Sequence, residues 1–321
     1  MLKFLYILTS NEKDIYYEQT LVSVLSLRHY NPQAFITLLV DDKTDKNLVG
    51  FRSEIKNLID EYKVVPFDDR LSNMVRSRFL KTNMRNLIEG DFLYIDGDTA
   101  VVDRLDSILS NVVTGSVCAV ADLHASENDK YHLKHKKMLA HKKKMNFSLS
   151  LGEKYFNGGV IFARDDVPAH EFFTKWHELY RQCAQNGIFT DQISFNEINH
   201  VLGRPIEELP GEWNCQVREA YNHLYRVKTI YPILCRSKII HFFCTGIDGK
   251  KEPHPLMRKD FFDKIKAQQV VDEFSMQIIC SAKNQFWGAP EKLDESVSFP
   301  KFFLFRQFPK VCKLLKWLNV I

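Results

Sequence analysis

The stretch FLYIDGDTAVVD, residues 92–103, decides the fold class of this chain. It opens with four apolar or aromatic residues, which is typical of a buried strand, and then changes abruptly to Asp96, Gly97 and Asp98. In open α/β sheets, ligands bind beyond the carboxyl ends of the strands. Two carboxylates directly after a strand therefore predict an α/β protein with a ligand site at that end of its sheet.

Short and long apolar patterns alternate on both sides of this stretch. Short runs that end at polar residues predict strands, and segments with apolar residues three and four apart predict helices. Their alternation predicts a mainly parallel, Rossmann-like sheet flanked by helices, with a small helical segment at the C-terminus. Pro168 suits the start of the last long helix. The predicted strands are 4–8, 35–40, 63–67, 92–95, 117–121 and 160–163, and the predicted helices are 17–29, 48–62, 71–88 and 169–184.

The length and composition suit one catalytic domain with an appendage. The 321 residues are 45% hydrophobic, and we expect a catalytic domain over 1–250 and a C-terminal extension over 251–321. No run of eighteen apolar residues occurs, and the start MLKFLYILTSNEKD is more typical of a buried strand than of a signal peptide. We therefore expect a cytoplasmic protein. The seven cysteines are scattered without a CxxC pair, which argues against a disulfide framework or a zinc knuckle.

The net charge of +4 is unevenly distributed. The basic segment 130–144 is interpreted either as a solvated helix or loop, or as a site for an acceptor or an anionic surface. In the tail, 299–321, Lys310, Lys313 and Lys316 form one basic stripe of an amphipathic helix. Such a helix either lies on anionic lipid at the inner face of the cell membrane or packs on the catalytic domain. No nucleic-acid partner is expected.

The acidic pair after the strand has a chemical interpretation of its own. Asp96 and Asp98 can converge on one hard cation, and Gly97 lets the backbone approach a ligand closely. A diphosphate carries more charge than protein groups alone offset easily, so Mg²⁺ or Mn²⁺ bridging the carboxylates and the phosphate oxygens is the expected solution. The alternative is an acidic surface turn without a ligand.

Four separate blocks resemble glycosyltransferase family 8, retaining enzymes of the GT-A fold that include bacterial lipopolysaccharide galactosyl- and glucosyltransferases. YIDGD resembles the family's YLD-x-D motif, and FNGGVIFAR resembles its F-N-x-G-V strand. TDQISFN resembles the D-Q-x-x-x-N helix start, and IIHFFCTG resembles the H-x-x-G segment. The blocks occur in the family's order and extend to about Gly246. One block would be weak evidence, whereas four in order are specific.

The resemblance implies a role for each matched residue. Asp96, Asp98 and His241 are expected to bind the metal ion, and an imidazole beside two carboxylates favours Mn²⁺ over Mg²⁺. Asp191, Gln192 and Asn157 are the expected catalytic residues, although Asp191 is also placed to cap a helix. Arg78 is expected at the donor diphosphate, with a helix-surface arginine as the alternative. The full set expected at the nucleotide sugar is Leu8, Thr9, Tyr17, Arg78, Asp96, Gly97, Asp98, Asp122, Asn157, Gly158, Asp191, Gln192, Gly246 and Lys251.

The sequence departs from the family at two places. The family often has an aspartate for the uracil beyond the first strand, where this chain reads ILTSNEKDIYY and offers Thr9 and Tyr17 instead. The family's K-P-W after the histidine is replaced by GIDGKKEPHP, which puts a phosphate contact by Lys250 or Lys251 in question.

The reaction implied is transfer of a galactose or glucose from a UDP-sugar to a saccharide or lipid-linked saccharide, in bacterial surface glycan synthesis such as that of lipopolysaccharide. Retention arises either from two inversions or from attack on the face that the diphosphate leaves. No carboxylate is an obvious nucleophile and Gln192 would be a poor one, which favours same-face attack.

Two other interpretations compete with a transferase. IDGDT also resembles the D-x-D-x-T motif of aspartate-nucleophile phosphatases, but those enzymes carry it on the first strand, and only Asp165 and Asp166 offer a loose match to their later acidic pair. A non-catalytic nucleotide-sugar binder is the third interpretation, and the intact Asp96, Asp98 and His241 argue against it.

Overall fold

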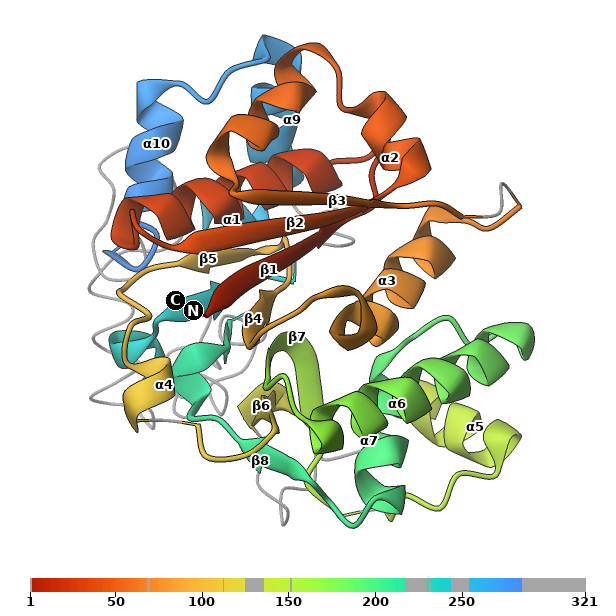
Figure 1. Cartoon of the computed structure of the whole chain (residues 1–321). Coiled ribbons are helices and arrows are strands. Elements are labelled where there is room, and N and C mark those ends of the chain that lie inside the picture. Colours follow the sequence, from red (N-terminus) through yellow and green to blue (C-terminus); the bar gives the residue numbers. More distant parts are fainter. Residues whose placement is uncertain are drawn as a thin grey trace, which may run out of the picture. The chain divides into compact units, whose positions relative to one another are not determined.

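A computed structural model describes most of the chain (Figure 1). Its described residues form two compact units. The first unit comprises those within 1–17, 33–97 and 106–210, and the second comprises those within 18–32, 98–105 and 211–321. Gly246, Lys250, Lys251 and the tail 299–321 lie outside the described residues. The described residues are 2–67, 70–111, 113–124, 136–150, 152–217, 230, 232–243 and 254–284.

The first unit is built on a seven-stranded sheet with the order β3-β2-β1-β4-β7-β6-β8. Neighbouring strands run parallel except at β7, which is antiparallel to both β4 and β6. The predicted mainly parallel sheet is therefore confirmed, and two of the predicted strands have the observed bounds. The strands are β1 (Lys3–Leu8), β2 (Phe35–Asp41), β3 (Glu61–Val65), β4 (Phe92–Ile95), β6 (Val117–Ala121), β7 (Phe156–Ala163) and β8 (Ile206–Glu208).

Burial explains why the central strands have few polar residues. Every residue of β4, β6 and β7 is buried, as are five of the six residues of β1. Strands covered on both faces have nearly continuous apolar runs instead of an alternating pattern. The polar residues after Ile95 and Ala121 therefore mark the points where these strands leave the core.

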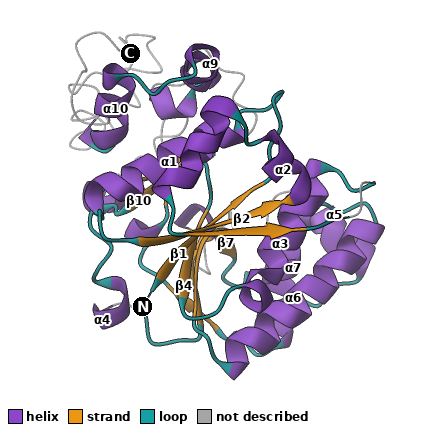
Figure 2. Ribbon diagram, turned by 45° about the horizontal axis from the view of Figure 1, so that its top comes forward, coloured by secondary structure: helices purple, strands orange, loops and turns teal. Residues whose placement is uncertain are grey.

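Helices α3 (Asn73–Leu87), α6 (Val167–Gln185) and α7 (Gln192–Val201) complete the core of the first unit (Figure 2). Phe172, Trp176 and Phe195 join α6 to α7 in one aromatic cluster, with ring centroids 4.7–6.4 Å apart. Side chains cap two of these helices. The Ser72 hydroxyl accepts from Val75 N at the start of α3, and the Asp166 carboxylate accepts from Ala169 N at the start of α6. The remaining helices of this unit are α2 (Asp42–Asn47), η1 (Gly50–Leu58), α4 (Ile108–Asn111), η2 (Asp122–His124) and α5 (Lys136–Met145).

The prediction of a helix over 48–62 and a strand over 63–67 is wrong in its details. A 3₁₀-helix covers Gly50–Leu58, and strand β3 already begins at Glu61. Gly50 has a φ of 55°, which few other residues adopt, so the chain turns there rather than continuing a helix. Asp60 then hydrogen-bonds to Ile36 through its backbone NH and its carboxylate, which starts the pairing with β2.

The second unit has a three-stranded sheet with the order β5-β10-β9. Its middle strand, β10, runs antiparallel to β5 and parallel to β9. Helix α1 is bonded to this sheet, because the Ser26 hydroxyl accepts from Val101 N at 2.9 Å. No helix of the described residues is long and apolar enough to span a bilayer. Its elements include most of α1 (Tyr16–Tyr30), β5 (Thr99–Val101), η3 (Gly211–Trp213), β9 (Cys215–Gln216), β10 (Ile239–His241), η5 (Pro255–Met257), α9 (Lys259–Gln268) and α10 (Glu273–Cys280).

Candidate functional site

The acidic turn links β4 to β5 and is held by backbone hydrogen bonds at both ends. Asp96 N donates to Gly159 O of β7 at 2.8 Å, and Asp98 O accepts from Phe242 N at 3.0 Å. Between these two bonded residues, Gly97 is the only residue that separates the aspartates. The backbone therefore fixes where both aspartates leave the chain.

His241 ends β10 and is buried, directly opposite Thr99 in the register of the sheet. Its Nδ1 lies 3.0 Å from Asn214 Oδ1, an oxygen that only accepts, so Nδ1 carries the hydrogen in this arrangement. The other ring nitrogen, Nε2, faces Asp98, 3.1 Å from Oδ1. A lone pair and a carboxylate oxygen at this distance repel each other unless a proton or a metal ion lies between them.

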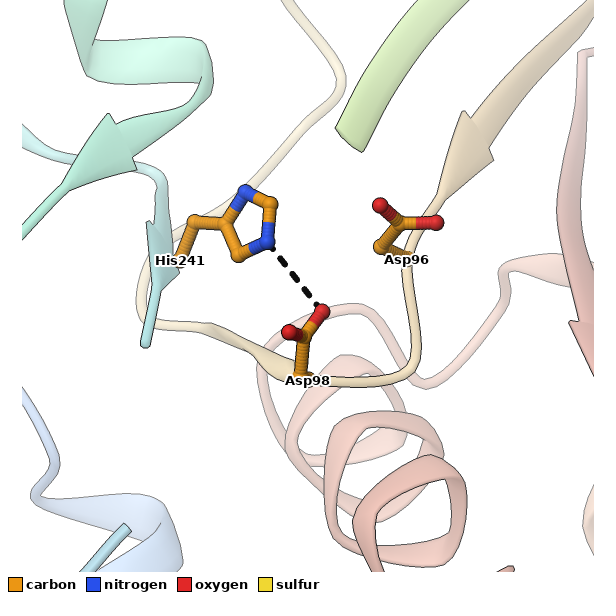
Figure 3. Close-up of side chains that lie close together, drawn as sticks. All are labelled: Asp96, Asp98 and His241. Atoms are coloured by element: carbon orange, nitrogen blue, oxygen red, sulfur yellow. Dashed lines mark ion pairs between the residues drawn. The ribbon is translucent and has the colours of Figure 1, made fainter. Parts of the chain in front are cut away.

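Asp96, Asp98 and His241 come together as the sequence predicts (Figure 3). One potential ligand atom from each residue lies within 4.8 Å of the other two. Two carboxylates and an imidazole suit a divalent ion that accepts both oxygen and nitrogen ligands. The Asn214 oxygen that accepts from Nδ1 fixes the ring orientation, as outer partners of metal-binding histidines usually do. The chemistry of this set therefore fits a divalent ion.

Asp96 also faces a buried ammonium group that the sequence analysis did not foresee. Lys81 of α3 has a side chain that is only 4% exposed, and its Nζ lies 3.2 and 3.3 Å from the two Asp96 carboxylate oxygens. The Tyr94 hydroxyl donates to the same carboxylate. Burial, followed by the charge of Asp96, raises the pKa of Tyr94, so this hydroxyl keeps its proton.

Asp191 is the second carboxylate beside Lys81. Its Oδ2 lies 3.4 Å from Lys81 Nζ, and its Oδ1 lies 3.0 Å from Arg78 Nε. Burial alone would raise the pKa of Asp191, but the charges of Lys81 and Arg78 outweigh it and the pKa lies below its usual value. Asp191 precedes α7 as predicted, yet its side chain makes no capping bond. It is therefore engaged with cations rather than with the helix end.

Asn157 and Asp122 form a neighbouring polar pair in the first unit. Asn157 Nδ2 donates to Asp122 Oδ1 at 3.0 Å, and its Oδ1 accepts from Gly159 N at 2.8 Å. Both ends of the buried amide are thereby oriented. A Cβ at Gly158 would lie 3.6 Å from Lys81 Nζ, so this glycine borders the ammonium. Gln192 is the first residue of α7 and is partly buried.

Thr9 and Tyr17, the predicted base contacts, are buried, and so is Leu8, which was predicted at the nucleotide sugar. Leu8 ends β1, and Thr9 follows with its hydroxyl donating to Asn73 O at 3.3 Å. The Tyr17 hydroxyl donates to Phe51 O at 2.8 Å, and its ring lies beneath the Arg52 guanidinium. Their roles at the donor stay predictions, as do those of Gly246 and Lys251.

Lys81, Tyr94 and Asn214 are the site neighbours that sequence reasoning missed. Lys81 carries one usable signal, because it lies three residues after Arg78 and helical residues three apart share a face. Tyr94 sits two residues before Asp96 on a strand, where alternate residues share a face. Nothing in the sequence connects Asn214 with His241, which is 27 positions away.

Comparison with solved structures identifies the fold. The galactosyltransferase LgtC in complex with donor and acceptor sugar analogues aligns with a TM-score of 0.50 and 16% identity, over 85% of this chain and 98% of that one. An active-site mutant of LgtC aligns with a TM-score of 0.51 and 14% identity, over 85% and 99%. The predicted GT-A fold is thereby confirmed. No curated protein gives a significant match.

The sequence itself identifies the family. The model of glycosyl transferase family 8 matches residues 8–247, which include the acidic turn, the Asn157 block, the Asp191 helix start and His241. This match favours a glycosyltransferase over the phosphatase interpretation of IDGDT. The chain therefore belongs to glycosyl transferase family 8.

Proposed function

We propose that this glycosyltransferase moves a hexose from a UDP-sugar to a hydroxyl of a saccharide or glycolipid, with retention at the anomeric carbon. We further propose that Asp96, Asp98 and His241 hold a divalent ion, Mn²⁺ in preference to Mg²⁺. The observation that carries this proposal is the convergence of one ligand atom from each of these residues within 4.8 Å.

A bound divalent ion supplies positive charge to the departing diphosphate and orients its oxygens. The protein's part is to fix the ligands in advance, so that little reorganisation is needed when charge develops. His241 meets that requirement through its bond to Asn214, and Asp96 meets it through Tyr94. Arg78 is partly exposed and paired with Asp191, a position from which we propose that it contacts the diphosphate.

The neighbourhood of Asp191 supports same-face attack over a covalent intermediate. Its carboxylate is shared between Lys81 and Arg78, which lowers its pKa and its nucleophilicity. We propose that Asp191 positions sugar hydroxyls, that Gln192 faces the anomeric carbon, and that Asn157 orients Asp122 toward the sugar. None of these groups needs to form a bond to carbon.

The likeness to LgtC makes galactose the first donor sugar to examine, with glucose the second. A saccharide acceptor in bacterial surface glycan synthesis follows from the same likeness and is proposed on that basis alone. We place the transferase activity in residues 1–250, since the family match ends at residue 247.

A screen of UDP-sugars with Mn²⁺ tests the proposal. The full chain is incubated with each UDP-hexose, with and without mixed saccharide acceptors, and UDP release is measured. We expect one UDP-hexose to release UDP with the wild type and not with Asp98→Ala. Asp263→Asn, an exposed aspartate of α9, is the matched control and should behave as wild type. Equal UDP release by wild type and Asp98→Ala would refute the metal assignment, and release of phosphate from simple esters would support a phosphatase instead.

A further inference from the structure

Lys81 is a cation placed where a metal ion is expected to meet its ligands. Its ammonium contacts both oxygens of Asp96 and lies 3.4 Å from Asp191. All three residues belong to the first unit, and the lysine side chain is almost fully buried. A buried ammonium requires nearby carboxylates, and here it has two of them.

Space and an aromatic ring fix the ammonium between the two carboxylates. Lys81 Nζ lies 5.0 Å from the centre of the Tyr94 ring, within the range of a cation–π contact. Gly158 borders the lysine on another side, where a Cβ would be in ordinary van der Waals contact with Nζ and Cε. The ammonium therefore lies between the Asp96 and Asp191 carboxylates and against the Tyr94 ring.

A divalent ion at Asp96 would lie close to the ammonium and be repelled by it. Two cations sharing one carboxylate oppose each other, and the opposition is strong where water is excluded. Asp191 is already a second partner of the ammonium, at nearly the same distance as Asp96, and can keep it when the ion takes Asp96. Ion binding and a shift of Lys81 toward Asp191 are therefore linked.

We propose that Lys81 is a positioning residue that occupies the Asp96 carboxylate before the ion arrives and pairs with Asp191 once the ion is bound. Lys81 thereby weakens ion binding to the donor-free protein. By pairing with Asp191 when the ion is present, Lys81 also fixes the position of the carboxylate that we propose faces the donor sugar. This inference rests on the proposed function, because it takes Asp96 as an ion ligand.

The test is Mn²⁺ affinity of the donor-free full chain, measured by electron paramagnetic resonance of free Mn²⁺. Replacing the ammonium by an apolar chain of similar length, Lys81→Met, removes the competitor, and we expect Mn²⁺ to bind about tenfold more tightly. Asp191→Asn removes the alternative partner and leaves Lys81 on Asp96, so Mn²⁺ should bind more weakly than to wild type. A purely structural disturbance would weaken binding in both variants.

Matched controls separate charge from folding. Lys81→Arg keeps the cation and should leave Mn²⁺ affinity near that of wild type. Lys175→Met removes an exposed lysine of α6 and should change nothing. If Lys81→Met fails to fold, the double variant Lys81→Met with Asp191→Asn removes both buried charges, and it should bind Mn²⁺ more tightly than Asp191→Asn alone.

The outcomes distinguish this inference from the proposed function. Mn²⁺ binding that depends on Asp98 but is unchanged or weakened by Lys81→Met would overturn the role of Lys81 and leave the metal site intact. Mn²⁺ binding that is absent, or indifferent to Asp98→Asn, would overturn both. Tighter binding by Lys81→Met together with weaker binding by Asp191→Asn would establish the competition.

Discussion

The two aspartates of the acidic turn are two residues apart, yet their surroundings differ in kind. Asp98 faces an imidazole nitrogen, the Nε2 of His241, at 3.1 Å. Asp96 faces a cation, the ammonium of Lys81, at 3.2 Å. A carboxylate beside an imidazole nitrogen can share an added metal ion with it, whereas a carboxylate beside an ammonium must first give up a partner. Under the proposed function, one acidic motif therefore combines a carboxylate that shares the ion with a histidine and a carboxylate for which the ion competes with a lysine.

Two buried histidines of the second unit show the same contrast. Both ring nitrogens of His254 are bonded to backbone groups, Nδ1 to Leu256 N and Nε2 to Ala282 O, each at 3.0 Å. His241 has one nitrogen on Asn214 and directs the other at a carboxylate. Because both nitrogens of His254 already have backbone partners, we assign a structural role to His254 and propose a functional one for His241.

Removing Asp98 should have the largest effect on activity. Asp98→Asn keeps the size of the side chain but removes the charge that faces His241, and we expect kcat/KM to fall about a thousandfold, or ~4 kcal/mol. Thermal unfolding should remain within a few degrees of wild type because Asp98 is partly exposed. Steady-state UDP release at fixed Mn²⁺ measures the effect. Activity within threefold of wild type would remove Asp98 from the metal site.

Removing the imidazole should cost less, because both carboxylates remain. For His241→Gln we expect a fall in kcat/KM of about a hundredfold, partly recovered at high Mn²⁺. His254→Gln is the matched variant and should lower thermal stability while leaving kcat per folded molecule unchanged. A titration of UDP release against Mn²⁺ compares the two. An activity loss of the same size in both variants would erase the contrast between these histidines.

Arg78 should have a smaller effect, seen mainly in donor binding. Arg78→Met removes the guanidinium paired with Asp191, and we expect about a tenfold rise in the donor KM, with Mn²⁺ affinity little changed. Arg181→Met, at an exposed position of α6, is the control. An unchanged donor KM would return Arg78 to the interpretation of a helix-surface arginine.

Replacing His254 should have the smallest effect on activity but a clear effect on the pH dependence of stability. Burial lowers its pKa to about 3 from 6.5, so the folded protein keeps this ring neutral. The stability it contributes is fully present above pH 6.5 and is lost as the pH falls from 6.5 toward 3, by about 1.4 kcal/mol per pH unit. Chemical denaturation at pH 7, 6 and 5 should show this decline in wild type and a shallower one in His254→Gln. Equal slopes would contradict the burial of an uncharged ring.

The sheet of the first unit and the acidic turn were predictable because buried strands leave a strong local pattern. FLYI is apolar throughout and ends at Asp96, and the same change occurs after Ala121. The second unit gave no such signal. Its strands are two or three residues long, too short for a periodicity, and their pairing joins residues far apart in the chain, such as Thr99 and His241. His241 was found only through the family resemblance.

The neighbours of the site were not predictable for a different reason. A lysine in an amphipathic helix is usually exposed, and Lys81 is buried only because Asp96 and Asp191 approach it from β4 and from the start of α7. Likewise, Asp191 occupies the position before α7 where an aspartate usually caps a helix, but its side chain makes no capping bond. Tertiary charge pairing overrides the local rule at both positions.

Pulsed electron paramagnetic resonance of bound Mn²⁺ tests the central claim most directly. With wild-type protein and UDP, one Mn²⁺ per chain should show coupling to a single ¹⁴N nucleus, because His241 supplies the nitrogen ligand, and the coupling should disappear in His241→Gln. A nitrogen coupling that survives in His241→Gln, or bound Mn²⁺ without any nitrogen coupling in wild type, would contradict the assignment of His241 with Asp96 and Asp98 to one ion.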